Sequence, residues 1–191
     1  MPDVFDTAKE SKPTLDLYGK SEFAKGCLIA RRLVERGVRM VQLSHSISGY
    51  DIAWDTGHGD IKGGHAHLAR ECDQGIAGLI QDLKLRGLLD ETLVIWGGEF
   101  GRAPTSEGQK GRDHDHYGFT VWMAGGGVKG GQVIGSTNPK GEHPQDRPLD
   151  PNDLLATIYR FLGIDHEAMV EDNSGRPIPL IPGGTAIEEL L

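Results

Sequence analysis

Apolar residues recur at helical spacing in three segments of the chain, and each segment ends at a glycine. The segments are residues 20–37, 64–87 and 150–163, which close at Gly37, Gly87 and Gly163. A 3.6-residue apolar period followed by glycine is typical of an amphipathic helix with its C-cap. The third segment also opens with Asp150 as an N-cap and Pro151 at the first helical position. We therefore expect three helices.

Short β-branched and apolar runs predict the strands. They are VRMVQLSH (38–45), LLDETLVIWG (88–97), GFTVWMAGGG (118–127) and a short fourth run, QVIG (132–135). The helix expected at 64–87 separates the first two runs, so they form a strand–helix–strand crossover, which normally joins parallel strands. The pattern therefore predicts an α/β fold, a partial doubly wound and mostly parallel sheet with flanking helices.

The remaining segments define the expected organisation of the chain. Residues 1–19 are polar and contain prolines, so we expect a loose N-terminal arm. Residues 20–165 hold the helices and strands of one domain, and 166–191 form a C-terminal tail. Because the domain opens with a helix that leads into a strand, we expect it to be the C-terminal half of a larger domain whose N-terminal half is missing.

The composition argues against nucleic acid as a binding partner of the chain and against a membrane span. The formal net charge of −8 argues against nonspecific nucleic-acid binding, which needs a basic surface. No apolar run is long enough to span a membrane. The first residues carry no signal-peptide pattern, so the compartment cannot be read from the chain itself. Cys27 and Cys72 both fall within helical apolar patterns, which predicts buried free thiols.

Chemically reactive side chains follow the expected strands. The loops at 46–63 and 98–117 carry carboxylates, histidines and arginines: Asp55, His58, Glu99, Arg102, Arg112, His114 and His116. Ligands of parallel α/β sheets bind beyond the carboxyl ends of the strands, where these loops would meet. Carboxylates and imidazoles are ligands for a divalent metal, with zinc favoured and manganese or calcium as alternatives. Arginines in the same place can hold an oxyanion.

Each motif also has a simpler reading. Asp55 and His58 are compatible with a turn acid beside a solvated histidine, and Glu99 with a helix cap or a surface charge. His114 and His116 alternate with acids, as they would in a solvated polar loop. The glycine-rich run 124–131 lacks the spacing of a phosphate-binding loop, and no G-x-S-x-G elbow occurs. The metal interpretation depends on three segments, 54–60, 97–102 and 111–118, meeting at one edge of the sheet.

Four blocks of the sequence resemble one family. WDTGHGD (54–60), the segment ending in GGEFGRAP, GRDHDHYG (111–118) and DLLATIYRFLGID occur in the order found in the domain of unknown function 1501. That family is a sulfatase-like branch of the alkaline phosphatase superfamily, and the resemblance covers about residues 20–165. It implies an alkaline-phosphatase-like fold and cleavage of phosphate or sulfate esters, usually with two metals and a Ser, Thr or modified Cys nucleophile.

The resemblance also assigns roles to individual residues. Asp55 and His58 match a metal-binding loop, with a spacing one residue shorter than in related pyrophosphatases, and His114 matches the later histidine of that site. Glu99 and Phe100 stand where the superfamily keeps a second Asp-His pair, and Phe100 cannot coordinate a metal. Arg102, Arg112 and His116 would contact the substrate.

Two further expectations follow from the resemblance. The nucleophile is expected upstream of this chain, and the export signals of full-length relatives imply a periplasmic or secreted protein. We expect a small or polymeric anionic ester as substrate. Two alternatives stay open on the same fold: a catalytically inactive binding or structural module, and a phosphomutase-type transferase.

Overall fold

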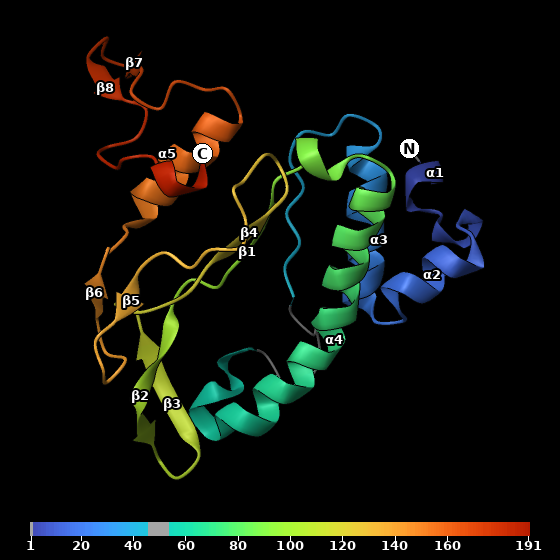
Figure 1. Ribbon diagram of the computed structural model, residues 1–191, viewed down its shortest axis with the longest axis horizontal. Coiled ribbons are helices and arrows are strands. Elements are labelled where there is room, and N and C mark those ends of the chain that lie inside the picture. Colours follow the sequence, from blue (N-terminus) through green and yellow to red (C-terminus); the bar gives the residue numbers. More distant parts are fainter. Residues whose placement is uncertain (1, 46–53) are drawn as a thin grey trace. The chain divides into compact units, whose positions relative to one another are not determined.

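The computed structural model describes residues 2–45 and 54–191, which form helices and small antiparallel sheets of the α/β class (Figure 1). The chain divides into two compact units. The first comprises Met1–Thr92 and Arg102–Asp115, and the second Leu93–Gly101 and His116–Leu191. Each unit has its own packing and is described by itself.

The first unit is built around two helices, α3 (Glu22–Val34) and α4 (Gly57–Leu85), which pack side by side (Figure 1). They confirm the helices expected at 20–37 and 64–87, and α4 begins seven residues earlier than expected. The glycines after both helices have positive φ, 81° at Gly37 and 69° at Gly87. Such backbone conformations cost glycine little, which explains why both helical patterns stop there.

The N-terminal segment differs from the loose arm that we expected. It contains α1 (Pro2–Phe5), the 3₁₀ helix η1 (Thr7–Lys9) and α2 (Lys12–Tyr18). Tyr18 is buried in the core cluster, where it packs with residues of α3. Burial of this aromatic side chain anchors α2, because removing a large apolar ring from water is strongly favourable. The remaining members of the cluster and its partly buried neighbours are Ala24, Cys27, Leu28, Leu15, Leu17, Phe23 and Leu79.

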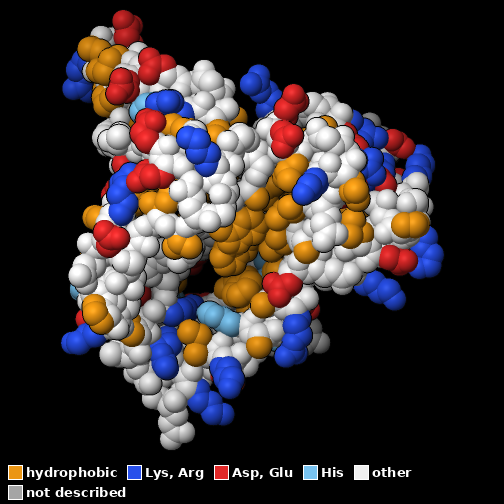
Figure 2. Space-filling model, in the orientation of Figure 1, with side chains coloured by type: hydrophobic (Ala, Val, Ile, Leu, Met, Phe, Trp, Pro, Cys, Tyr) orange, Lys and Arg blue, Asp and Glu red, His pale blue; other side chains and the backbone are white. Residues whose placement is uncertain are grey.

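A buried ion network stabilises the same helices. The Arg31 side chain is 2% exposed and lies 3.0 Å from Glu10, 2.6 Å from Glu35 and 2.8 Å from Asp82. Tyr18 of α2 donates a hydrogen bond of 3.0 Å to Asp82 of α4. A buried guanidinium needs several acceptors to offset the loss of hydration, so these partners fix α3 against α4. Acidic and basic side chains are also interspersed over the face shown in Figure 2.

Residues 98–117, expected as a loop, contain a β-hairpin instead. Strands β2 (Gly101–Glu107) and β3 (Gly111–Asp115) pair through a three-residue connection, 108–110. Gly108 has a φ of 60°, a conformation that suits a short hairpin loop. The expectation of a loop was wrong because both strands are polar and lack the apolar alternation by which strands are recognised in a sequence.

The expected parallel sheet is also wrong. Residues 38–45, expected as its first strand, have no helix or strand assignment, and Met40 is 82% exposed. Strand β1 (Val94–Trp96) pairs instead with β4 (Trp122–Ala124), antiparallel, with Trp96 opposite Trp122. Along the chain, the β2–β3 hairpin lies between β1 and β4, and no crossover helix does. Parallel strands need such a crossover, so this connection leads to antiparallel pairing. An alkaline-phosphatase-like fold is therefore not visible in this arrangement.

The second unit combines two more small sheets with one helix. Strands β5 (Ser136–Thr137) and β6 (Pro144–Asp146) pair, as do β7 (Met169–Glu171) and β8 (Pro177–Pro179). The QVIG segment at 132–135, expected as a strand, precedes β5 and is not one. Short 3₁₀ helices lie at η3 (Leu89–Glu91) in the first unit and η4 (Glu188–Leu190) in the second.

Helix α5 (Pro151–Phe161) confirms the third helical segment and its start signal. The Asp150 side chain accepts a 2.8 Å hydrogen bond from the backbone of Asn152, and Asp153 accepts one of 2.8 Å from the Asp150 backbone. This capping box satisfies backbone donors that the first turn leaves unpaired. Ala156 of α5 forms a small core with Ile181 and Ala186.

Both cysteines are free and buried, as the sequence predicts. Burial raises the pKa of Cys27 to about 12 and that of Cys72 to about 11. Both thiols are therefore protonated at neutral pH. Across residues 2–45 and 54–191, no helix has the length and apolar character needed to cross a membrane.

Candidate metal centre

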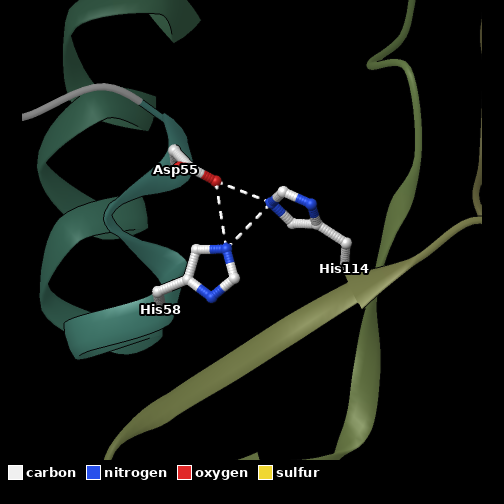
Figure 3. Close-up of side chains that lie close together, drawn as sticks. All are labelled: Asp55, His58 and His114. Atoms are coloured by element: carbon white, nitrogen blue, oxygen red, sulfur yellow. Dashed lines mark hydrogen bonds and ion pairs between the residues drawn. The ribbon is translucent and has the colours of Figure 1, made fainter.

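Three candidate metal ligands meet in the first unit. Asp55 lies in the 3₁₀ helix η2 (Trp54–Thr56), His58 in the first turn of α4, and His114 near the end of β3. Their side chains point toward one another across the gap between helix and hairpin (Figure 3). Residues from two distant parts of the sequence thus form one cluster.

The distances within this cluster are short. His114 Nε2 lies 2.7 Å from Asp55 Oδ1 and 2.9 Å from His58 Nε2. His58 Nε2 lies 3.3 Å from Asp55 Oδ1. All three atoms can donate a lone pair to a cation. The side chains are partly open to solvent, with 63% of Asp55, 33% of His58 and 38% of His114 exposed.

A kink in α4 sets the direction of its first turn. Asp60 has non-helical dihedral angles, φ −152° and ψ 89°, and its Oδ1 accepts a 3.0 Å hydrogen bond from the backbone of Gly63. Asp60 therefore acts as an internal N-cap for the longer part of the helix. The backbone N–H of Ile61, freed by the kink, donates to the carbonyl of Lys110 in the hairpin loop at 3.3 Å. The kinked turn that carries His58 is thereby joined to the hairpin that carries His114.

Gly111 allows this close approach of hairpin and helix. A Cβ atom built on Gly111 would lie 1.7 Å from the backbone oxygen of His58. No side chain fits at that separation, so the hairpin backbone lies directly against the helix start.

Arg102 ties the remaining ligand segment to the hairpin. Its guanidinium donates to the carbonyl of Trp54 at 3.1 Å, to Asp55 Oδ1 at 3.1 Å and to the carbonyl of Arg112 at 3.2 Å. The side chain is 13% exposed. Since its donors reach oxygens of both η2 and β3, Arg102 positions Asp55 against the strand that holds His114.

Charges around the cluster shift two pKa values. The hydrogen bond from His114, followed by that from Arg102, lowers the pKa of Asp55. The hydrogen bond to Glu107 raises the pKa of His58, against the opposing effect of burial. Asp55 is therefore a carboxylate at neutral pH, which is the form that binds cations.

Three other sequence-predicted site residues, Glu99, His116 and Arg112, are not members of this cluster of three. Glu99 and His116 belong to the second unit, where Glu99 is exposed after β1 and the His116 ring contacts Tyr117 at 4.0 Å. Arg112 is on β3 and donates to Ser106 Oγ at 3.2 Å and to the carbonyl of Gly111 at 2.7 Å. Roles for Glu99, His116 and Arg112 in ligand or substrate binding stay predictions.

Two acids lie next to the cluster: Glu107, which sequence reasoning missed, and Asp113, which it noted only as one of the acids that alternate with His114 and His116. Glu107 Oε2 lies 2.5 Å from His58 Nδ1, and Asp113 Oδ1 lies 3.9 Å from the same nitrogen. Together with His58 they form a second group with donor atoms close enough to share an ion. Glu107 carries no motif of its own, and only a hairpin placed over residues 101–115 would have brought it to His58.

Comparison with known proteins identifies the family. Residues 1–191 match the family described as "Protein of unknown function (DUF1501)", and the chain therefore belongs to that family. The match confirms the resemblance to the domain of unknown function 1501 that the sequence shows. No curated protein and no solved structure matches the chain.

Proposed function

We propose that this DUF1501 chain is part of a metal-dependent hydrolase of phosphate or sulfate esters, in which Asp55, His58 and His114 hold one divalent cation. The observation that carries the proposal is the convergence of three donor atoms at separations of 2.7, 2.9 and 3.3 Å. The sulfatase-like, alkaline-phosphatase-like assignment is part of the same proposal and draws on the sequence resemblance alone.

The donor set fits zinc. Two donors that bind one zinc ion at bond lengths of about 2.0–2.1 Å, with angles of about 90–110°, lie about 2.8–3.4 Å apart. The separations in the cluster fall within about 0.1 Å of that range. Two imidazoles favour zinc over calcium, which prefers an all-oxygen shell, and manganese remains an alternative.

The local hydrogen bonds are compatible with a bound cation. Carboxylates are acceptors only, so the contact with Glu107 requires a proton on His58 Nδ1. In neutral His58, the Nε2 lone pair then faces Asp55 Oδ1 and His114 Nε2. A proton or a metal ion among these atoms is needed to offset their repulsion.

Three protein ligands leave part of the coordination shell open, as catalytic zinc sites do. A bound divalent ion there would polarise a phosphoryl or sulfuryl oxygen and lower the pKa of a bound water. The chain's own residues would orient the ligands: Arg102 holds Asp55, while the hairpin presents His114. Arg112 and His116 are proposed substrate contacts, and Glu99 is proposed to join this site or a weaker second one.

The substrate is proposed to be a small or polymeric anionic ester. A periplasmic or secreted location and a nucleophile contributed from upstream of these residues are proposed from the family resemblance. The two cysteines support an outside nucleophile or a metal-bound water, because Cys27 and Cys72 are buried and protonated.

A second candidate is a binding or structural module that holds a metal without turnover. Phe100 favours it, because phenylalanine cannot replace the second histidine that the resemblance places there. The buried cysteines fit this reading equally well, since they offer no thiolate.

Turnover assays separate the two candidates. The purified protein, loaded with zinc or manganese, is incubated with p-nitrophenyl phosphate and p-nitrophenyl sulfate. The hydrolase proposal expects release of p-nitrophenol that Asp55→Ala reduces by at least about 100-fold. Stoichiometric metal binding without any turnover would favour the binding module.

A further inference from the structure

We propose that Glu107 is a positioning residue that fixes the tautomer and orientation of His58 for metal binding. The inference rests on the proposed metal site, whose ligands are Asp55, His58 and His114. It adds a residue that no sequence motif marks. Glu107 stands at the end of β2, and its Oε2 lies 2.5 Å from His58 Nδ1.

The chemistry of the contact determines which nitrogen of His58 faces the cluster. An ionised carboxylate accepts hydrogen bonds and cannot donate them, so Nδ1 carries the hydrogen. Neutral imidazole has one N–H only, which leaves Nε2 with its lone pair. Nε2 is the atom that lies 2.9 Å from His114 and 3.3 Å from Asp55. Glu107 thus makes the nitrogen that faces the cluster the one able to bind a metal.

The arrangement matches a general feature of metal-binding histidines. The ring nitrogen that does not bind the metal usually donates to a carboxylate, which fixes the ring and makes the other nitrogen more basic. The hairpin provides this partner because the connection at 108–110 returns the chain from Glu107 to Gly111, which lies against the backbone of His58.

The competing interpretation is a second metal bound by His58, Glu107 and Asp113. The distances favour positioning, since 2.5 Å is a hydrogen-bond length while Asp113 lies 3.9 Å from the same nitrogen. A metal at Nδ1 in addition to one at Nε2 would also require His58 to lose both ring protons. A single carboxylate that accepts one hydrogen bond from Nδ1–H requires no such loss.

The first test measures the tautomer in the metal-free protein. Nitrogen-15 NMR of histidine-labelled protein at pH 8.5 distinguishes protonated from unprotonated ring nitrogens. We expect wild-type His58 to carry its hydrogen on Nδ1, and Glu107→Gln to retain this form because the amide oxygen still accepts. Glu107→Ala should shift His58 toward the Nε2–H form. An unchanged tautomer in Glu107→Ala would overturn the proposal, whether or not the protein binds metal.

The second test is zinc titration by calorimetry, with zinc alone as the probe. We expect Glu107→Ala to weaken zinc binding by about 10–100-fold with an unchanged stoichiometry. Asp113→Asn, which keeps an acceptor for the backbone N–H of His114, is the matched control and should bind like wild type. Loss of a second zinc equivalent in both variants, with the first unchanged, would overturn positioning in favour of a second metal.

These outcomes separate the two proposals. If wild-type protein binds no zinc, the proposed function fails, while the tautomer measurement still decides the role of Glu107. The Glu107 side chain is 47% exposed, so Glu107→Ala should melt at the same temperature as wild type. Weaker binding at an unchanged melting temperature therefore reports on the site rather than on folding.

Discussion

The Nε2 atoms of His58 and His114 lie 2.9 Å apart, although 56 residues separate them in the sequence. One histidine comes from the start of a helix and the other from a strand of a hairpin, so the contact depends on how the hairpin packs against the helix. Asp55 Oδ1 completes the triangle at 2.7 and 3.3 Å. The central claim is that this triangle binds one divalent metal.

The packing that creates the triangle can be tested at Gly111. In Gly111→Ala the new Cβ would lie 1.7 Å from the carbonyl oxygen of His58, so the backbone of hairpin or helix must move. We expect destabilisation of at least about 1–3 kcal/mol, as for other overpacked sites. Zinc affinity should fall as well, because His114 moves away from His58. Thermal melting and zinc titration measure the two effects.

Gly59→Ala is the matched control for this substitution. Gly59 lies in the same helical turn as His58, and its added Cβ would meet nothing within 4 Å. We expect stability within about 0.5–1 kcal/mol of wild type, because alanine is the better helix former. Equal effects of the two substitutions would contradict the packing described for Gly111.

The buried ion network of the first unit gives a second prediction. Asp82→Ala removes the carboxylate that lies 2.8 Å from Arg31 Nε, and it also removes the acceptor of Tyr18. The buried guanidinium loses one of its partners, so we expect a loss of about 3–5 kcal/mol in the free energy of unfolding. Urea denaturation followed by circular dichroism measures this loss.

An exposed pair provides the comparison. Lys12 and Asp16 lie 2.5 Å apart on α2, with 82% and 60% of their side chains exposed. Solvent screens such a pair, so Asp16→Ala should cost less than about 1 kcal/mol. If Asp82→Ala proved as mild as Asp16→Ala, the network around Arg31 would not be a source of stability.

The lowered pKa of Glu10 predicts that the folded protein loses stability at acidic pH. Burial raises the pKa of this carboxyl, but hydrogen bonds from Arg31 and Arg32 outweigh it and lower the pKa below the ordinary value of 4.5. A lowered pKa in the folded state stabilises the protein fully above the unfolded-state pKa. This contribution is lost as the pH falls below about 4.5 and through the folded-state pKa.

Urea denaturation at pH 7 and at pH 3 tests this behaviour. Glu10→Gln should lower the stability at pH 7 and reduce the difference between the two pH values, because the variant has no carboxyl to titrate. An unaltered pH dependence in Glu10→Gln would show that other acids determine the acid sensitivity.

The helices could be predicted from the sequence because their signals are local. The cap at Asp150 with Pro151, and the glycines Gly37 and Gly87, define helix ends through backbone geometry that a few residues determine. The sheet could not be predicted in the same way. Apolar runs at 38–45 and 88–97 indicate strands, but pairing partner and direction depend on tertiary contacts and on the unrecognised hairpin.

The candidate site was predictable in its ligand types and only partly in its members. Asp55, His58 and His114 could be chosen because each motif offered metal-binding atoms, and the structure brings them together. Glu107 could not be found, since its role depends on a hairpin register rather than on a motif. Arg102 was expected to face a substrate, and in the structure its guanidinium contacts Asp55 and two backbone carbonyls.

Metal content of the purified protein tests the central claim most directly. Wild-type protein is dialysed against zinc, washed and measured by inductively coupled plasma mass spectrometry, in parallel with Asp55→Ala and His114→Ala. We predict one zinc per chain in the wild type and a loss of at least about 10-fold in affinity in each variant. Stoichiometric zinc that survives both substitutions, or its absence from folded wild-type protein, would contradict the account.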